Sequence, residues 1–539
     1  MGTAYKIHPG IGIARVGRST KGYFLQGERA GAPPFEISPT GEEAPFTGYK
    51  DDTFLIRREA VRFRVYRYET DDTTGRMTLI GEVLPSDAKV IWRVTLANSK
   101  SAGPAMVTGD GPGGSRVIIP KWGELRNDLP SGVDRDTLVA RTSYEVSGSK
   151  VTAPRKTGRI GLDEVFIGEA RTDDAGRLIV LGGLGFAGTF DHVAHELPDF
   201  LNNPGWYDDV ADGPVDADLL FPDGTRVSVQ HGAWVVVAPP DFVPNTAPVL
   251  NLFDVLEDDF FRDGRLNLPS TISYVDDIRP ILQKMADLED VNDMRVWGEA
   301  KSLLANESRL ADPTPAGAAA RQHAMIVMLK PERPGGLMDF RYTSYVKAKL
   351  ERWRAGQFIP GRDASRPALT EPEELDQATL RRAVGGGFFP GIEAGFMFTL
   401  PSLFSELGRF SRGPFQDHDG KMRALVPGSV TQRMAVPWQA DFTECEGRWW
   451  PSQRPDLARF GPFGEPYPGT PAPGQSGYYW HRGVVVGSVG DQLGDPKQHL
   501  SHFNMVERFA QLGVLGATIV DGRRVIAELG RHPSLDATV

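Results

Sequence analysis

The sequence predicts an α+β protein, with an antiparallel, β-sandwich-like N-terminal part, a helical middle region and a long C-terminal segment rich in glycine, proline and aromatic residues. In the first 247 residues, short runs rich in Val, Ile, Thr and Tyr alternate apolar and polar side chains, as half-buried strands do. From residue 248 the apolar residues recur every three or four positions, which is the helical period. The strands follow one another without intervening helices, which favours antiparallel packing over β-α units.

The region 1–247 is expected to be mainly antiparallel β-structure. Its clearest strand segments are bounded by Gly, Pro and Asp, which is typical of short strands joined by turns. They are 54–69, 89–98, 137–148 and 226–242.

The region 248–384 is expected to be helical. Six segments carry apolar residues at helical spacing: 248–263, 273–288, 292–305, 318–330, 344–356 and 371–385. The last of these begins with acidic residues, carries arginines late and ends at a glycine, which is the charge order that a helix dipole favours.

The region 385–539 begins with a long stretch of little periodicity. Such a segment inside a compact protein is more often functional than idle. It holds the single cysteine of the chain, Cys445, and four of the ten tryptophans. A helix at 502–513 and a hairpin at 517–529, turning on Asp521 and Gly522, are predicted at its end.

The composition excludes several classes of function. A net charge of -10 with both signs interspersed argues against nucleic acid and anionic membranes as partners. One cysteine excludes an intrachain disulfide framework and a cysteine-based zinc or iron–sulfur site. The chain shows no apolar run of membrane-spanning length and no signal-peptide pattern at its first residues, so a cytoplasmic protein is expected.

A glycine-rich motif lies at Gly183, Gly185 and Gly188 and matches G-x-G-x-x-G. A dinucleotide site would need a helix directly after it, but prolines and turn residues follow instead. Upstream, the sequence DDAGR resembles a hairpin turn. A plain glycine-rich loop is therefore the favoured interpretation.

Two polar clusters invite a metal-site interpretation. His192 and His195, with Asp191 and Glu196, could face a metal from one helix, but Pro198 weakens that helix and surface polarity is favoured. An acid-rich stretch lacks the twelve-residue calcium pattern, and we expect a solvated loop there. Its residues are Asp208, Asp209, Asp212, Asp216 and Asp218. No metal site is predicted.

Cys445 leaves three alternatives open. It could be a nucleophile paired with His481 or His502, although no protease or transferase signature surrounds it. Its sulfur could be joined to an oxidised indole, with Asp441, four residues earlier, as the base that moves protons. The residues alone favour the third alternative, an aromatic core patch with a capping aspartate.

Five segments that occur in the same order as in a known family favour the second alternative for Cys445, a sulfur joined to an oxidised indole. They are 7–17 (IHPGIGIARVG), 202–215 (NNPGWYDDVADGPV), 233–242 (AWVVVAPPDF), 385–395 (GGGFFPGIEAG) and 436–445 (VPWQADFTEC). Together they resemble the L-lysine ε-oxidase/glycine oxidase family of cysteine tryptophylquinone amino-acid oxidases.

The resemblance implies an oxidoreductase that deaminates an amino acid or primary amine through a Schiff base and releases ammonia and hydrogen peroxide. Cys445 matches the cysteine of the thioether, and Asp441 matches the aspartate that serves cofactor maturation and catalysis. The resemblance also implies a homo-oligomer and a flavoprotein partner for maturation of the cysteine tryptophylquinone.

One departure from the family pattern concerns the quinone tryptophan, which is expected in a late helix. In this chain that helix reads NMVERFAQLG and places Phe509 at the tryptophan position. Trp480 is the candidate substitute, because His481, a candidate catalytic residue, and Arg482 adjoin it. Arg448 and Arg482 are candidates for binding a substrate carboxylate. The alternative is a quinone-free relative that binds a ligand or uses other cysteine chemistry.

Overall fold

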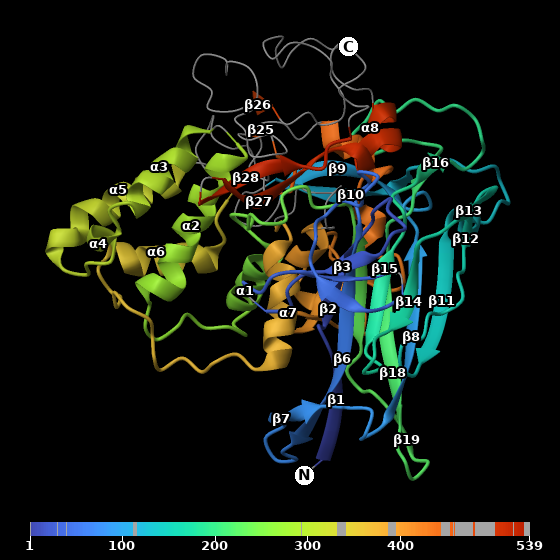
Figure 1. Ribbon diagram of the computed structural model, residues 1–539, viewed down its shortest axis with the longest axis horizontal. Coiled ribbons are helices and arrows are strands. Elements are labelled where there is room, and N and C mark those ends of the chain that lie inside the picture. The colour runs from blue at the N-terminus through green and yellow to red at the C-terminus, as the bar shows by residue number, and fades with distance from the viewer. Residues whose placement is uncertain are drawn as a thin grey trace.

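The structure is a computed structural model, and its α+β architecture confirms the predicted class. A large twisted sheet fills one side, and a group of helices packs on the other (Figure 1). The residues that it describes are 2–29, 31–38, 40–110, 116–292, 294–330, 341–385, 395–443, 453–455, 457–458, 478–479, 502–520 and 522–532.

Fourteen of the described strands form one continuous sheet. They are β1 (Gly2–His8), β2 (Ile11–Arg15), β3 (Tyr23–Leu25), β4 (Phe35–Ile37), β5 (Glu43–Pro45), β6 (Arg58–Thr70), β7 (Met77–Glu82), β8 (Lys89–Asn98), β11 (Ala140–Ser147), β14 (Gly168–Thr172), β15 (Leu178–Gly182), β18 (Ala211–Leu220), β19 (Arg226–Ser228) and β20 (Ala233–Ala238). The central order is β11-β8-β18-β20-β2-β6-β3-β4-β5.

Most neighbouring strands of this sheet are antiparallel, as expected, but β2 with β20 and β3 with β6 are parallel. The predicted strand at 226–242 is two strands, β19 and β20. Both pair with β18, and the break between them lets β20 also pair with β2. The sequence could not predict these parallel pairs. The alternation of apolar and polar side chains along a strand depends only on which face is buried, and it is the same beside a parallel or an antiparallel neighbour.

Seven two-stranded units surround the sheet within the described residues. They are β9 (Pro104–Asp110) with β10 (Arg116–Leu125), β12 (Gly158–Ile160) with β13 (Asp163–Val165), β16 (Ala187–Thr189) with β17 (Trp206–Asp208), β21 (Phe404–Glu406) with β22 (Arg409–Phe410), β23 (Phe415–Gln416) with β24 (Met422–Arg423), β25 (Leu457–Ala458) with β26 (Tyr478–Tyr479), and β27 (Val514–Val520) with β28 (Arg523–Leu529).

The described α-helices fall where the helical period predicts them, except the short helix α4, which lies between two predicted segments. They are α1 (Leu252–Arg262), α2 (Arg279–Asp287), α3 (Arg295–Leu304), α4 (Glu307–Leu310), α5 (Ala318–Met328), α6 (Ser344–Arg354), α7 (Glu371–Arg382) and α8 (His502–Arg508), with the π-helix η3 (Tyr274–Ile278) before α2 and the 3₁₀-helices η10 (Trp438–Thr443) and η11 (Phe509–Gln511) near the end. None of the described helices has the length and apolar character that crossing a membrane requires.

Local signals fix the ends of the main helices. Asn251 and Asp254 form a reciprocal capping box at the start of α1, in which each side chain accepts a hydrogen bond from the other's backbone N–H. Thr370 and Glu373 form a capping box at the start of α7.

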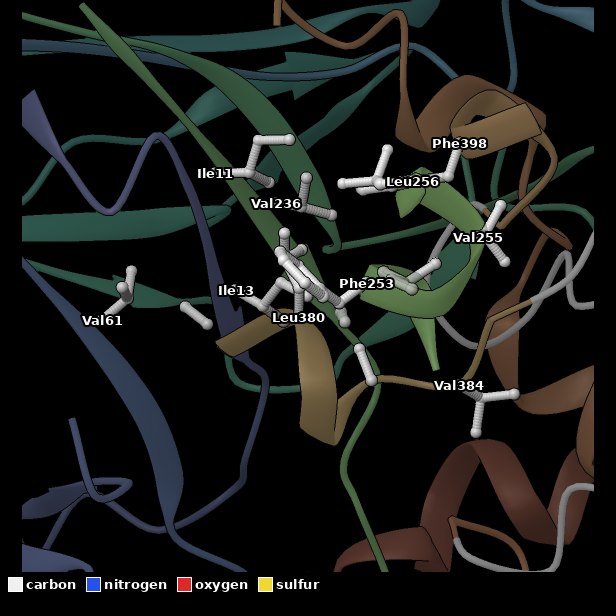
Figure 2. Packing of buried hydrophobic residues seen from close by; sticks show 14 of the residues in the cluster. Ile11, Ile13, Val61, Val236, Phe253, Val255, Leu256, Leu380, Val384 and Phe398 are labelled. Carbon is white, nitrogen blue, oxygen red and sulfur yellow. The ribbon is translucent and has the colours of Figure 1, made fainter. Parts of the chain in front are cut away.

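The core lies between the sheet and the two helices that cover it, α1 and α7. Figure 2 shows Ile11 and Ile13 of β2 and Val236 of β20 facing Phe253 of α1 and Leu380 of α7. All five side chains are buried, and each large apolar side chain removed from water contributes about 1.5–3 kcal/mol. The sheet and the helical region therefore share one core.

Two predicted hairpins are confirmed. The turn DDAGR joins β14 to β15, which pair antiparallel, and the terminal hairpin pairs Val520 with Arg523 across its turn. After β15 the glycine-rich motif leads into β16 rather than into a helix. The dinucleotide fold is thereby excluded, and the plain loop interpretation is confirmed.

Candidate functional site

The predicted site begins at η10, whose backbone carries Asp441. Two buried groups hold the start of this helix in place. Asp208 Oδ2 accepts a hydrogen bond from the backbone N–H of Trp438 at 2.9 Å, and Asn203 Nδ2 donates to the carbonyl of Val436 at 2.9 Å. The position of η10 is therefore set by residues more than 200 positions earlier in the chain.

Asp208 is fully buried, and so is the cation that it pairs with. Lys100 Nζ lies 2.6 Å from Asp208 Oδ2 and donates a second hydrogen bond, of 2.7 Å, to the carbonyl of Ala435. Asn98 Nδ2 donates to Asp208 Oδ1 at 3.0 Å. Burial lowers the pKa of Lys100 to about 8, and the attraction of Asp208 opposes that shift.

Arg126 completes this arrangement, which we call the Asp208 cluster (Asn98, Lys100, Arg126 and Asp208). Its guanidinium is buried and donates to the carbonyls of Gln432 at 2.9 Å and Met434 at 2.6 Å. Burial lowers the pKa of Arg126 to about 10. The cluster therefore binds the chain just before η10 through backbone carbonyls, independently of the side chains of that segment.

The expectation of a solvated acidic loop was wrong for four of its five residues. Asp208, Asp209, Asp212 and Asp218 are buried, and Asp216 is half-exposed beside Arg412. Buried carboxylates require partners, and those partners are distant in the sequence. For this reason the local run of acids resembles a surface loop when it is read alone.

Asp212 and Asp218 illustrate those partners. Asp212 accepts hydrogen bonds from the backbone N–H and hydroxyl of Thr431 and from the indole of Trp234, and burial raises its pKa to about 6. Asp218 pairs with Arg93 at 2.7 Å and with Arg226 at 2.6 Å.

Phe509, at the predicted tryptophan position, opens η11 and lies against η10. Its ring is fully buried, with its centroid 5.0 Å from that of Trp438 and the two planes at 80°. This edge-to-face geometry is the favourable one for aromatic pairs. The late helix and η10 are thus brought together, as the predicted site requires.

Lys50 fastens the backbone that follows Phe509. Its ammonium donates to the carbonyl of Ala510 at 2.7 Å and to that of Leu512 at 2.5 Å, and Ile56 N also donates to Ala510. Burial lowers the pKa of Lys50 to about 7. The carbonyls at the end of a helix favour a cation, so Lys50 stabilises this end of η11.

The glycine-rich loop 183–186 contacts both η10 and η11. Gly185 has φ +73°, and a Cβ there would stand 2.1 Å from Phe509 Cζ, so the phenyl ring lies directly on the glycine. Gln439 Nε2 donates to the carbonyl of Gly185 at 3.1 Å. We call this arrangement the Gly185 junction, and its members are Arg18, Gly185, Phe186, Asp209, Gln439 and Phe509.

Arg18 covers the junction from the solvent side. Its Nε donates to the carbonyl of Leu184 at 3.0 Å and its Nη2 to that of Gly185 at 3.2 Å. The guanidinium carbon lies 3.9 Å from the ring centre of Phe186 and 5.2 Å from that of Phe509. Such stacking is attractive, so Arg18 is held in a fixed orientation.

Asp209 supports the same loop from within the protein. Its Oδ2 accepts a hydrogen bond from the backbone N–H of Phe186 at 3.0 Å, and the side chain is buried. Burial raises the pKa of Asp209 to about 7, against the effect of that hydrogen bond.

Sequence reasoning missed Arg18, Asp209 and Gln439. Arg18 and Asp209 lie in or beside segments that carry the family resemblance, and Gln439 lies within one. The left-handed backbone of Gly185 could have been suspected from the glycine motif, because glycine is the usual residue for that conformation. No local signal indicates that this loop meets η10 and η11.

The predicted site residues lie at the limit of the described structure. The backbone of Asp441 belongs to η10, but its side chain lies outside the described part. Cys445, Arg448, Trp480, His481 and Arg482 also lie outside the described residues. Their predicted roles stay predictions.

The described residues do not fit a tryptophylquinone at position 509. A phenyl ring has no fused indole to oxidise, and Phe509 fills the space between Gly185 and Trp438. No chemical step is therefore derived through such a group at this position.

The histidines near residue 192 are surface polarity, as predicted. His192 Nε2 lies 2.7 Å from Asp163, and His195 pairs with Asp191 at 2.8 Å. Among the described residues, no group of three or more His, Cys, Asp or Glu side chains could hold a metal ion.

Comparison with known families gives two matches. The model described as L-Lysine epsilon oxidase N-terminal matches residues 8–237, and the model described as L-lysine epsilon oxidase C-terminal domain matches residues 337–461. The L-lysine 6-oxidase of Marinomonas mediterranea is 23% identical over 547 aligned positions, which cover 82% of this chain and 71% of that protein.

Solved structures give the same fold. The Schiff base intermediate of L-Lys ε-oxidase from Marinomonas mediterranea with L-Lys has a TM-score of 0.73 at 20% identity and covers 99% of this chain and 95% of its own. Another structure of the ε-lysine oxidase from that organism has a TM-score of 0.75 at 19% identity, with 98% and 95% covered. The architecture described above is thus shared over nearly the whole of both chains.

Proposed function

The chain belongs to the L-lysine epsilon oxidase family, and from this premise we propose that it oxidatively deaminates an amino acid. Family membership makes it an oxidoreductase of the amino-acid oxidase class. In the proposed reaction an amine, dioxygen and water give a carbonyl compound, ammonia and hydrogen peroxide. The carrying observation is the match of both family models to this one chain.

The packing of η10 against the segment around Phe509 supports this proposal. The Asp208 cluster fixes the backbone before η10, and Lys50 fixes the backbone after Phe509. Accurate placement of groups supplies much of an enzyme's rate acceleration. We propose that Asp441, on η10, removes the proton from the carbon that bears the reacting amine.

The two electrons must leave through a group other than residue 509, because Phe509 is a phenylalanine. Trp480 remains the predicted carrier of a quinone, with Cys445 as the predicted thioether partner. We also propose that a flavoprotein partner matures those residues in the cytoplasm.

The second candidate function is a quinone-free relative that binds an amino acid without oxidising it. The observation that favours it is Phe509 itself, which is fully buried and tightly packed at the expected position of the tryptophan.

The test uses the chain purified from its source organism, so that any maturation partner has acted. Hydrogen peroxide release and oxygen uptake are measured with each of the twenty amino acids. The same sample is examined by intact mass, by visible absorption and by titration of the thiol of Cys445. A thioether-linked quinone predicts a changed mass, visible absorption and no free thiol.

The Asp441→Ala variant is expected to release peroxide roughly 10²–10⁴-fold more slowly, as is typical for the loss of a general base. Asp223→Ala, in an exposed turn, is the control and is expected to leave the rate unchanged. No peroxide from any amino acid would contradict the oxidase, and unchanged turnover in Asp441→Ala would remove that residue from the mechanism.

A further inference from the structure

The Gly185 junction places an arginine without a carboxylate partner above the buried ring of Phe509. Across the described residues, no Asp or Glu oxygen lies within ion-pair distance of Arg18, whereas most other buried or half-buried arginines of the sheet are paired. The hydrogen bonds of Arg18 go to the two carbonyls of Leu184 and Gly185. A guanidinium has five N–H donors, so the edge that includes Nη1 is not used by these bonds.

Asp209 attracts this cation but forms no ion pair with it. It lies on the inner side of the loop and is bonded to the backbone N–H of Phe186. Burial raises the pKa of Asp209 to about 7, which weakens this attraction as the pH falls. The guanidinium edge of Arg18 that its two hydrogen bonds leave unused can therefore bind an anion.

Gln439 provides a second and independent observation. Its side chain is fully buried, and its Nε2 donates to Gly185. Its Oε1 has no hydrogen-bond partner in the described part of the chain. A buried acceptor that is left unpaired destabilises the protein, and a ligand that supplies an N–H donor removes this destabilisation.

The two side chains converge on one atom. Arg18 Nη2 lies 3.2 Å and Gln439 Nε2 lies 3.1 Å from the carbonyl oxygen of Gly185, so the two nitrogens cannot be further apart than the sum of these distances. Both side chains therefore lie beside the same carbonyl group, where one small ligand can contact the two of them.

We propose that Arg18 binds the carboxylate of an amino-acid ligand and that Gln439 Oε1 accepts a hydrogen bond from its ammonium group. The assignment rests on the proposed function only for the class of ligand. Phe186, which is 49% exposed, stacks on the guanidinium of Arg18. Solvent therefore reaches the junction at the residue that Arg18 stacks on.

The experiment compares pairs of ligands that differ only in the carboxylate. Glycine is paired with methylamine, and L-lysine with 1,5-diaminopentane. Each is titrated into the full-length chain by calorimetry. At least one amino acid is expected to bind the wild-type chain 10-fold or more tightly than its matched amine, because a guanidinium–carboxylate pair is charge-assisted and bidentate.

Arg18→Gln is expected to weaken binding of that amino acid roughly 10- to 100-fold and to leave the amine unchanged. Arg18→Lys, which keeps the charge and loses the planar fork, should give an intermediate loss. The matched control is Arg265→Gln. Arg265 also stacks on a phenylalanine, at 3.7 Å from Phe260, and donates to two backbone carbonyls, but it lies in the helical region.

The proposal is overturned if no amino acid binds more tightly than its amine, or if Arg18→Gln weakens both ligands equally. Arg18→Lys supplies the same comparison if Arg18→Gln does not fold. Peroxide release in the same samples separates the two claims. Amino-acid binding without peroxide contradicts the oxidase and supports the role of Arg18, whereas equal oxidation of amine and amino acid does the reverse.

Discussion

Asp208 and Asp209 are neighbours in sequence and both are buried, yet they serve two different regions of the molecule. Asp208 belongs to a saturated cluster, with Lys100, Asn98 and the backbone of Trp438 as partners. Asp209 belongs to the Gly185 junction, where one of its oxygens has no hydrogen-bond partner among the described residues.

Asp208 is the last residue of β17, and Asp209 lies in the bend that follows this strand. The side chain of Asp208 meets the buried cation Lys100, whereas that of Asp209 meets the backbone of the glycine-rich loop. A cluster that holds a backbone segment in place is most stable when all its hydrogen-bonding groups are paired within the protein. A site that binds a ligand needs donors or acceptors that the protein itself leaves unpaired.

The largest expected effect is a loss of stability when the Asp208 cluster is disrupted. Asp208→Ala leaves the ammonium of Lys100 buried without its counter-charge, and we expect the free energy of unfolding to fall by about 3–5 kcal/mol. Urea unfolding followed by circular dichroism measures this change.

Asp216→Ala is the matched control, because that residue lies nearby in the sequence but is half-exposed. A loss within about 0.5 kcal/mol is expected for it. Equal losses in the two variants would show that Asp208 contributes no more than a surface charge.

The next largest effect is a loss of stability when the backbone of the Gly185 junction is altered. Gly185→Ala places a methyl group on the ring of Phe509 and forces alanine into a left-handed conformation. Together these are expected to lower the free energy of unfolding by about 2–4 kcal/mol. Gly224→Ala, also at positive φ but with no atom near its Cβ, isolates the conformational part. A loss in Gly185→Ala no greater than in Gly224→Ala would mean that Phe509 moves aside freely.

The smallest effect, at about pH 4, belongs to a pH titration of the stability that tests the buried carboxyl of Asp209. The folded-state pKa of Asp209 is about 7, above its ordinary value near 4. The folded state therefore holds more protons than the unfolded state between about pH 4 and 7, and the contribution of Asp209 to stability falls as pH rises through that window.

Asp209→Asn removes this dependence. Relative to the wild type, the variant should gain stability steadily from about pH 4 to pH 7 and remain level above it, with a difference within about 1 kcal/mol at its lower end. Unfolding in urea at closely spaced pH values measures it. A difference that is flat across this range would contradict a buried carboxyl with a raised pKa.

Much of the fold could be predicted locally. The predicted strand 89–98 coincides with β8, the acid-first segment at 371–385 contains α7, and the turn at 521–522 joins β27 to β28. These elements are fixed by side-chain period, capping residues and turn residues, all within a few positions of each other. The resemblance to the oxidase family, carried by five short segments, is likewise confirmed by the family matches.

The candidate site was predicted only in part. The ring of Phe509 packs on Trp438 of η10, the helix that also carries the backbone of Asp441. The predicted roles of Asp441, Cys445 and Trp480 stay predictions. Arg18 and Gln439 were not predicted, because their roles depend on a shared contact with Gly185.

The sequence by itself determined the order of strands and helices, the family and the identity of residue 509, because each is written in neighbouring residues. Only the tertiary structure decided which acids are buried and which arginines have no carboxylate partner among the described residues. Those properties depend on contacts such as Lys100 with Asp208 and Arg18 with Phe509, which join positions 108 and about 490 residues apart. A local sequence pattern cannot predict which distant residue pairs with a buried charge, because the two residues come into contact only when the chain folds.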